Sequence, residues 1–387
     1  MKQSLFLVSL SILIVSCCSS VQDKKGTAAL IDNPFDFLLK KKSVDKLVEK
    51  NHLALVGKTG DLKAFNRYLK ILDTGNLVSI AYTLDYIKTC IPADDVDRDS
   101  ICFLFNMYFF KIANRFSDLL ETKYKYLIDV MWKKSNTDTL KYLADNLTKC
   151  GADIYPTEGI YYLDMLPDYI YDNFKNRVSD GVREYWLIRK GELKEGFSDD
   201  ASMLISFVQL YLRVKRWENF LEKYPNTVYT NEAHFYYDTY LETLMTGMDN
   251  TRVFDLDSNT LEPEVKFIYE GIIAEKPVTR TTELITSYYN FLSRHNFKDN
   301  DSIKPYLQAI HHSSMIGVQP PTRWIKACWL LWYYQFFRLR HPRLYLAPPE
   351  KRTYDANAAS ELILTSDFSP QETFPLLLFN KNSSQNP

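Results

Sequence analysis

The residues best suited to chemistry are cysteines, and two of them, Cys17 and Cys18, are adjacent near the start of the chain. A cysteine thiol can form a disulfide, bind a metal or accept an acyl chain. The preceding stretch, Leu5 to Ser16, is apolar apart from its serines and follows the basic residue Lys2. A membrane-spanning helix needs about 20 apolar residues, so this run is too short to be one. A basic start followed by a short apolar run is typical of a secretory signal.

The end of the apolar run, Ile14-Val15-Ser16-Cys17, resembles the lipobox of bacterial lipoproteins. The resemblance implies cleavage after Ser16 and acylation of Cys17, with palmitate among the expected chains. Each buried methylene adds about 0.8 kcal/mol of membrane affinity, so several chains on one cysteine anchor a protein without a spanning helix. A register that lipidates Cys18 fits the motif less well, because it places Cys17 before the cleavage point. An ordinary signal peptide followed by a chance cysteine is the alternative.

The expected location is the bacterial cell envelope, with the protein held by its lipid. In lipoproteins of the enterobacterial type, Asp after the acylated cysteine retains the protein at the inner membrane. Cys18 stands at that position here, which favours the outer membrane. The net charge of −1 argues against nucleic acid as a partner. The expected partners are therefore the membrane, through the lipid, and another envelope protein.

Four further cysteines are available for disulfides in an oxidising compartment. They are Cys90, Cys102, Cys150 and Cys328. Four cysteines allow three complete pairings, and their spacing does not choose among them. None forms a CxxC pair, so zinc-ribbon and thiol-redox sites are not indicated. We expect buried free thiols, with a single disulfide as the alternative.

Three patterns resemble ligand-binding motifs in part. Gly57-Lys58-Thr59 matches the end of a phosphate-binding loop, but His52 occupies the position that requires Gly. Asp94–Ser100 and Asp255–Thr260 place side-chain oxygens at alternate positions, as calcium loops do. Both lack the turn Gly at position six and the Glu at position twelve. We interpret the first acidic stretch as a helix N-terminus and the second as a solvated loop.

The histidines do not form a recognisable site. His311 and His312 are adjacent, so on a helix their side chains point about 100° apart and are poorly placed to share a metal ion. The sequence contains neither HExxH nor GxSxG. We therefore predict no catalytic residues, no cofactor site and no metal site.

Apolar residues recur at helical spacing along most of the chain. Gly is scarce, at 12 of 387 residues, which favours long helices with few special turns. Asp97–Ser100 can begin a helix that is apolar nearly all round and therefore central. Ser198-Asp199-Asp200 is a helix start signal, and Gly151 a stop signal. The four clearest stripes are Leu62–Leu72, Leu77–Ile87, Leu140–Cys150 and Met203–Leu221.

The later part of the chain shows the same pattern. Thr230 or Asn231 is the predicted cap of a helix that ends at Gly247, and a polar connection follows. Further helices are predicted over 263–274, 280–295 and 302–314, and a core helix between the prolines at 320–321 and Pro342. No sustained alternation of apolar and polar residues indicates a sheet.

These elements predict an all-α fold of stacked antiparallel helical hairpins, either a bundle or an irregular α-solenoid. The expected organisation is a signal peptide over 1–16, a lipid-anchored tether over 17–32, a helical domain over 33–341 and a Pro-containing C-terminal segment over 342–387. The helical domain is expected either as one body or as two subdomains divided near residue 195.

One internal segment, Phe220 to Leu241, resembles a helix junction of tetratricopeptide-type outer-membrane assembly lipoproteins. There a helix ends in F-x-x-x-Y-P-x-S-x-Y and the next helix begins with a small residue. The matching residues here are Phe220, Tyr224, Pro225, Thr227, Tyr229 and Ala233. The resemblance covers about 20 residues, and no copies recur every 34 or so. A generic helical hairpin is the alternative to a tetratricopeptide-like array.

The function that these observations favour is a helical scaffold, anchored by lipid, that binds another protein. The alternatives are an all-helical hydrolase acting on the cell wall and a carrier of a small apolar ligand. Two convergent carboxylates in an aromatic cleft would indicate the hydrolase, and a dry internal cavity would indicate the carrier.

Overall fold

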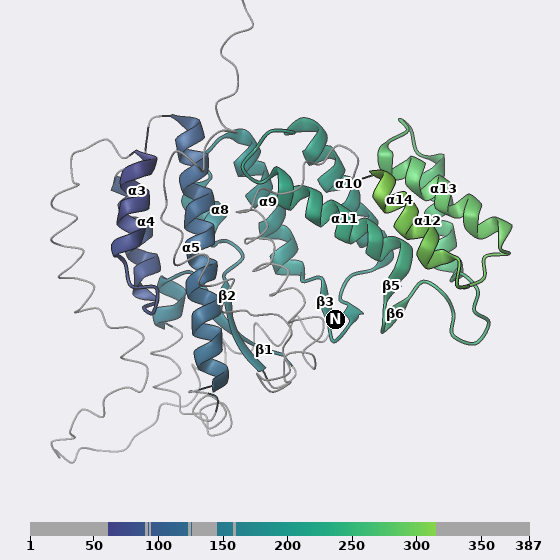
Figure 1. The fold of residues 1–387 in the computed structure, drawn as a ribbon, viewed down its shortest axis with the longest axis horizontal. Coiled ribbons are helices and arrows are strands. Elements are labelled where there is room, and N and C mark those ends of the chain that lie inside the picture. The colour runs from purple at the N-terminus through teal and green to yellow at the C-terminus, as the bar shows by residue number, and fades with distance from the viewer. Residues whose placement is uncertain are drawn as a thin grey trace, which may run out of the picture. The chain divides into compact units, whose positions relative to one another are not determined.

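The computed structural model describes residues 61–89, 92, 94–122, 125, 145–157 and 160–314. Of these residues 66% are helical, and the strands form only short antiparallel pairs, so the predicted all-α class is confirmed (Figure 1). Two compact units divide between Tyr169 and Ile170. Residue 195, near which the sequence suggested a division, is the last residue of a helix in the second unit. The predicted signal peptide, tether, 321–341 helix and C-terminal segment lie outside the described residues.

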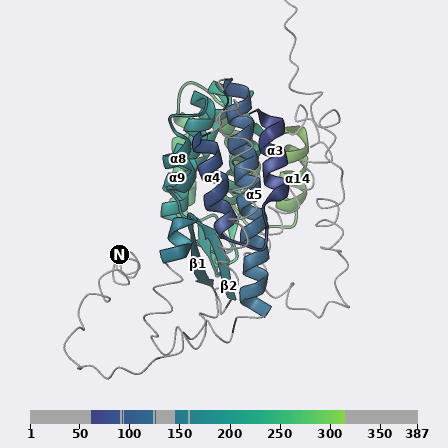
Figure 2. The same ribbon diagram turned by 90° about the vertical axis from the view of Figure 1, so that its left-hand side faces the viewer.

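The first unit is built around one long helix. Helices α3 (Leu62–Ile71) and α4 (Val78–Thr89) both pack on α5 (Asp95–Thr122), as Figure 2 shows. The carboxylate of Asp94 accepts the N–H of Val96 at 2.7 Å, and α5 begins at Asp95, two residues before the predicted start at Asp97. Cys102, Phe105 and Phe109 of this helix are completely buried. The prediction of a central helix at this position is confirmed.

A β-hairpin, which the sequence analysis did not predict, packs on α5. Strands β1 (Ala152–Thr157) and β2 (Ile160–Met165) pair with Ala152 opposite Met165. Burial alternates along β2, but the outward positions are also occupied by apolar or aromatic residues such as Ile160 and Tyr162. The period of two is therefore invisible in a simple apolar-polar pattern.

Side chains of α5 hold β2 in place by bonding its backbone. The hydroxyl of Ser117 accepts the N–H of Leu163 at 2.9 Å, and the carboxylate of Glu121 accepts the N–H of Tyr161. Gly151, predicted to end the helix before β1, has a φ of +72°. A Cβ at Gly151 would lie 2.2 Å from the ring of Tyr169, so glycine is required there for two reasons.

The second unit consists mainly of helices. After α8 (Tyr169–Phe174), which lies at the division, come α9 (Asp180–Glu195), α10 (Phe207–Lys223), α11 (Thr230–Thr246), α12 (Pro263–Ala274), α13 (Arg280–Arg294) and α14 (Ile303–Ser314). The predicted helix over 263–274 coincides with α12, and those over 280–295 and 302–314 differ from α13 and α14 by one residue.

The predicted start of α10 was wrong. Ser198-Asp199-Asp200 does not begin a helix, because β3 (Ser198–Asp199) and β4 (Ser202–Met203) form a tight hairpin there. Asp200 and Ala201 at its turn have φ of 45° and 55°, as such two-residue turns require. The cap of α10 is Ser206, which forms a capping box with Gln209.

A second tight hairpin, β5 (Gly247–Met248) with β6 (Thr251–Arg252), follows α11, which ends at Gly247 as predicted. The two hairpins are bonded to each other. The backbone N–H of Asn250 donates to the carbonyl of Ala201 at 3.0 Å, and its side-chain amide donates to the carbonyl of Asp200 at 2.6 Å. The predicted polar connection after α11 therefore begins with ordered structure.

Helices α10 and α11 form a hairpin whose turn contains Pro225, at the position that the tetratricopeptide resemblance implied. Tyr229 and Ala233 are completely buried beneath this turn. The N-cap of α11 is Tyr229, and neither Thr230 nor Asn231 has that role. The hydroxyl of Thr230 instead accepts the N–H of Thr227 at 2.8 Å, which places it inside the first turn of the helix.

The hairpin of α12 and α13 repeats the proline and the threonines of this turn 52 residues later, although the peptide before Pro277 is cis. Pro277, Thr279 and Thr282 correspond to Pro225, Thr227 and Thr230. The hydroxyl of Thr282 accepts the N–H of Thr279 at 2.5 Å. The buried pair Trp217 and Tyr236, with ring centroids 5.2 Å apart, corresponds to Tyr269 and Tyr288, at 6.1 Å. The second unit thus contains a repeat of 52 residues, which a search near a period of 34 misses.

Candidate functional site

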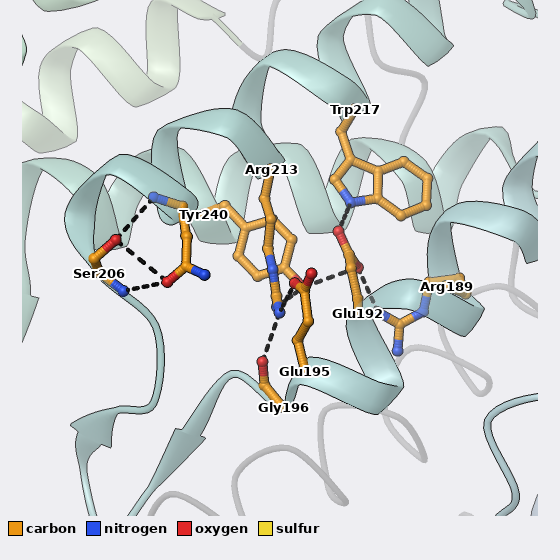
Figure 3. Close-up of polar contacts among 9 residues, drawn as sticks. Arg189, Glu192, Glu195, Gly196, Ser206, Arg213, Trp217 and Tyr240 are labelled. Atoms are coloured by element: carbon orange, nitrogen blue, oxygen red, sulfur yellow. Dashed lines mark hydrogen bonds and ion pairs between the residues drawn. The ribbon is translucent and has the colours of Figure 1, made fainter. Parts of the chain in front are cut away.

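Charged side chains are buried between α9, α10 and α11 (Figure 3). Glu192 of α9 is 2% exposed and Arg213 of α10 is 1% exposed. Burial of a charge is costly unless partners replace its hydration, so the bonds of these two residues decide what the cluster can do. We call Arg189, Glu192, Glu195, Arg213, Trp217 and Tyr240 the buried network.

The carboxylate of Glu192 accepts three hydrogen bonds, one from each of the three helices. Arg189, one turn earlier on α9, donates from Nη1 to Oε2 at 2.7 Å. Tyr240 of α11 donates its hydroxyl to the same oxygen at 3.0 Å. Trp217 of α10 donates Nε1–H to Oε1 at 2.8 Å. Glu192 therefore holds the three helices at one point.

Arg213 occupies the C-terminal end of α9. Its Nη2 donates to the carboxylate of Glu195 at 3.0 Å and to the carbonyl of Gly196 at 2.5 Å. Its Nη1 donates to the hydroxyl of Tyr240 at 3.3 Å. A cation at the C-terminal end of a helix interacts favourably with the negative end of the helix dipole. Here the cation also binds a terminal carbonyl. The hydroxyl of Tyr240 thus links the two halves of the network.

Aromatic rings enclose the network. The guanidinium carbon of Arg189 lies 3.9 Å from the ring centroid of Tyr236, and Trp217 stacks on that ring at 5.2 Å. The ring of Tyr185, whose centroid lies 5.5 Å from that of Trp217, stacks on Tyr229 at 4.1 Å. Such packing places the charges in a medium of low polarity, which strengthens each bond within the network.

Two groups near the network have shifted pKa values. Burial, and after it the charge of Glu192, raises the pKa of Tyr240 well above its usual value. Tyr240 therefore keeps its proton and remains a donor to Glu192 across the physiological range. Burial also raises the pKa of Glu232, in the first turn of α11, to about 7.

The network contains two carboxylates, but they do not form an acid–base pair of the kind that a hydrolase uses. Both oxygens of Glu192 are occupied by donors and the side chain is inaccessible. Glu195 forms its ion pair with Arg213, and about half of its side chain is exposed. The arrangement suits a structural clamp, because it joins three helices and presents no reactive oxygen to a substrate.

Few of the predicted site residues lie among the described residues. Cys17, Cys90, Cys328 and the Gly57-Lys58-Thr59 stretch fall outside them. Cys102 and Cys150 are buried, and Cys150 is a free thiol. Burial raises the pKa of Cys150 to about 12, so this thiol stays protonated and unreactive.

The two acidic motifs have structural roles. Asp95 and Asp97 of the first motif are in the opening turn of α5. In the second motif, the carboxylate of Asp255 accepts the backbone N–H of Ser258 at 2.8 Å and its hydroxyl at 2.7 Å. His311 and His312 lie in α14. Among the described residues, no group of three His, Cys, Asp or Glu side chains could hold a metal ion.

The buried network was not predicted from the sequence, although one signal was present. Arg213 interrupts the apolar stripe of α10 between Leu210 and Trp217, at a position that faces the core. A charged residue at such a position needs a buried partner. The sequence did not show that the partners are on α9 and α11, because only the packing of the helices brings these residues together.

Several large apolar side chains of the second unit are exposed. Phe267 on α12 is 75% exposed. Val208 and Leu212, one turn apart on α10, are each 50% exposed, and Leu204, which precedes that helix, is 49% exposed. Exposed apolar groups mark surfaces that bind other protein segments where they form a contiguous patch.

No protein-family model matches the chain, and no curated protein or solved structure is significantly similar to it. Within the ranges that the structure describes, no helix is long and apolar enough to cross a membrane.

Proposed function

We propose that this chain is a lipid-anchored protein of the bacterial envelope, held at the outer membrane through Cys17, and that its helical hairpins form a scaffold that binds another envelope protein. The apolar run that ends in Ile14-Val15-Ser16-Cys17 supports the anchor. The helical architecture of the second unit supports the scaffold, because helical hairpins commonly present binding surfaces.

The observation that carries the proposal is the exposure of Phe267. An exposed Phe forgoes about 2 kcal/mol that burial would provide. Gly271, one turn further along the same face of α12, has nothing within 4 Å of the place where a Cβ would be. A ring beside an open glycine forms a projection and a recess, which a partner side chain can fill.

The backbone that carries Phe267 is firmly held. Two residues later, Tyr269 donates its hydroxyl to the carbonyl of Leu244 at 2.8 Å. Tyr288 of α13 donates to the neighbouring carbonyl of Met245 at 3.2 Å. Both rings are completely buried. The exposed ring is thus presented by a rigid hairpin, which lowers the entropy lost on binding.

The test is photo-cross-linking in cells with p-benzoylphenylalanine in place of Phe267 in the full-length protein. We expect one dominant adduct with a second envelope protein. The matched control carries the cross-linker in place of Val96, which is 51% exposed on α5 of the first unit. Equal adduct patterns at the two positions, or none at position 267, would contradict the proposal.

The anchor has a separate test. Cys17→Ala is expected to leave the precursor unacylated and uncleaved, and therefore larger than the wild-type protein, because acylation normally precedes cleavage in lipoproteins of this type. Cys18→Ala is the matched control and should stay in the membrane fraction. A Cys17→Ala variant of unchanged size that remains membrane-bound would show that Cys17 is not the anchor.

A further inference from the structure

The exposed face of α12 is apolar along the whole length of the helix. Phe267 and Gly271 lie on this face, and the exposed residues Pro263 and Ala274 extend it to both ends. Successive members are four, four and three residues apart, so all four lie on one side of the helix. We call these four residues the α12 strip.

The α12 strip has a projection next to a recess. The ring of Phe267 is 75% exposed. Gly271 has no side chain, and nothing lies within 4 Å of the place where its Cβ would be. Ala274, the next member of the strip, adds only a methyl group. A large apolar side chain of a partner helix can therefore lie beside Phe267, over Gly271 and Ala274.

Acidic residues border the α12 strip on both sides. Glu264 and Glu270 are exposed. At 3.6 residues per turn, their side chains lie about 60° to either side of Phe267 around the helix axis. The hydroxyl of Tyr289 in α13 donates to the carboxylate of Glu270 at 2.7 Å, which holds this acid beside the strip. The exposed ring is therefore placed between two carboxylates.

The lysines of this region are directed to other groups or lie beyond the end of the helix. The ammonium of Lys266 is 4.3 Å from the ring centroid of Phe297. Lys215 of α10 forms an ion pair with Glu275, the C-cap of α12, at 2.6 Å. Lys276 follows that cap. The charge that borders the middle of the α12 strip is thus negative, and a complementary partner carries positive charge there.

We propose that the α12 strip binds an amphipathic helix of the partner protein, with large apolar residues facing the strip and Lys or Arg on both flanks. This inference rests on the proposed function, because it names the chemistry of the partner that Phe267 contacts. A helix is the matching shape, since apolar residues at helical spacing interlock with anchors of the same spacing. The twelve residues of α12 extend about 18 Å, so three to four turns of the partner cover the strip.

The test is photo-cross-linking of the full-length protein, purified in a non-ionic detergent, with p-benzoylphenylalanine in place of Phe267. The probes are two fluorescent model helices of 15 residues each. They share one face of Leu and Ala and differ only in their flanking residues, which are Lys in one and Glu in the other. We expect the Lys-flanked helix to give about fivefold more adduct at low salt. Equal adducts from the two helices, or no adduct from either, would overturn the inference.

The matched control carries the cross-linker in place of Leu187 of α9. Leu187 is 44% exposed and precedes Gly191, which also has nothing within 4 Å of a Cβ position. Exposed cations, Arg183 and Lys194, lie one and two turns away on the same face. The relief at position 187 therefore resembles that of the α12 strip, but the charge is opposite. The Lys-flanked helix should give no excess of adduct at this position.

Charge variants provide the second measurement. Glu264→Gln with Glu270→Gln keeps an acceptor for Tyr289 and should lower the adduct yield of the Lys-flanked helix about threefold at low salt. Changing both acids to Lys should reverse the preference between the two probes. Glu222→Gln, an exposed change on α10, is the control and should leave the yield unchanged.

The outcomes separate this inference from the proposed function. A preference for the Lys-flanked helix that survives the double Gln variant would overturn the basic partner. An adduct between two copies of the chain, without a probe, would assign the α12 strip to a second copy and would overturn it as well. The scaffold function is judged separately, by the adduct that position 267 forms in cells.

Discussion

The two hairpins of the second unit share a threonine hydrogen bond in their turns but have different cores. Four polar residues of the buried network, Arg189, Glu192, Arg213 and Tyr240, correspond at an offset of 52 residues to Leu241, Leu244, Val265 and Leu292. All four of the second set are buried. Trp217 donates to the side chain of Glu192 at 2.8 Å, and the corresponding Tyr269 donates to the carbonyl of Leu244 at 2.8 Å.

This comparison shows that corresponding core positions of the 52-residue repeat can be filled in two ways. An aliphatic core is stable without specific partners, whereas a charged core is stable only when every member is bonded. The network makes the first hairpin sensitive to the loss of any one member. It also fixes the relative position of α9, α10 and α11, because its hydrogen bonds have narrow geometric limits.

The largest expected effect comes from breaking the network at its centre. Glu192→Ala leaves Arg189, Trp217 and Tyr240 without their shared carboxylate acceptor, and we expect a loss of about 3–5 kcal/mol in the free energy of unfolding. Denaturant unfolding followed by circular dichroism measures it. Glu222→Ala, an exposed change on α10, is the control and should cost less than about 0.5 kcal/mol. A loss of that small size in Glu192→Ala would mean that the network is dispensable.

Replacing the four polar residues together tests the comparison directly. The variant Arg189→Leu, Glu192→Leu, Arg213→Val and Tyr240→Leu copies the second hairpin into the first. Well-packed apolar residues often replace a buried ion pair without loss, so we expect a stability within about 2 kcal/mol of the wild type, well above that of Glu192→Ala. A quadruple variant less stable than Glu192→Ala would show that the two cores are not interchangeable.

The pH dependence of stability at Glu232 gives a further test of the difference between the two hairpins. Its counterpart in α13 is Leu284, and burial raises the pKa of Glu232 to about 7, above the ordinary value of 4.5. A raised pKa means that the folded state holds the proton more tightly, so this stabilisation is present below about pH 4.5 and is lost as the pH rises through 7. Glu232→Gln should therefore gain about 2 kcal/mol at pH 8 and nothing at pH 4.

Unfolding at the two pH values measures this difference, with Glu222→Gln as the exposed control. An equal change at pH 4 and pH 8 would show that ionisation of Glu232 is not responsible.

The smallest expected effect comes from the shared turn. Thr230→Val and Thr282→Val each remove a hydroxyl that accepts a backbone N–H, from Thr227 and Thr279 respectively. We expect each substitution to lower the free energy of unfolding by about 1 kcal/mol or less. The two losses should be similar, because the two turns use the same hydrogen bond. Thermal unfolding of the two variants compares them. A large cost in one hairpin alone would show that the turns are not equivalent.

Much of the helical architecture was predictable because apolar spacing is a local property. The apolar spacing over 263–274 predicted both ends of α12, and Pro263 is the first residue of this helix. Gly151 and Gly247 ended their helices as predicted, since both have φ near +70°. Local signals failed where two were in competition. Ser198-Asp199-Asp200 is a valid helix start, but it is used as a tight turn because Ser206 and Gln209 form a better cap.

The sequence by itself determined the all-α class and, to within one residue, the ends of α12, α13 and α14. These conclusions depend on residues a few positions apart. Only the tertiary structure decided that Arg213, Glu192 and Tyr240 meet, that β2 is bonded to α5, and that Phe267 faces solvent. These contacts join residues tens of positions apart, and they depend on how helices pack, which no local pattern specifies.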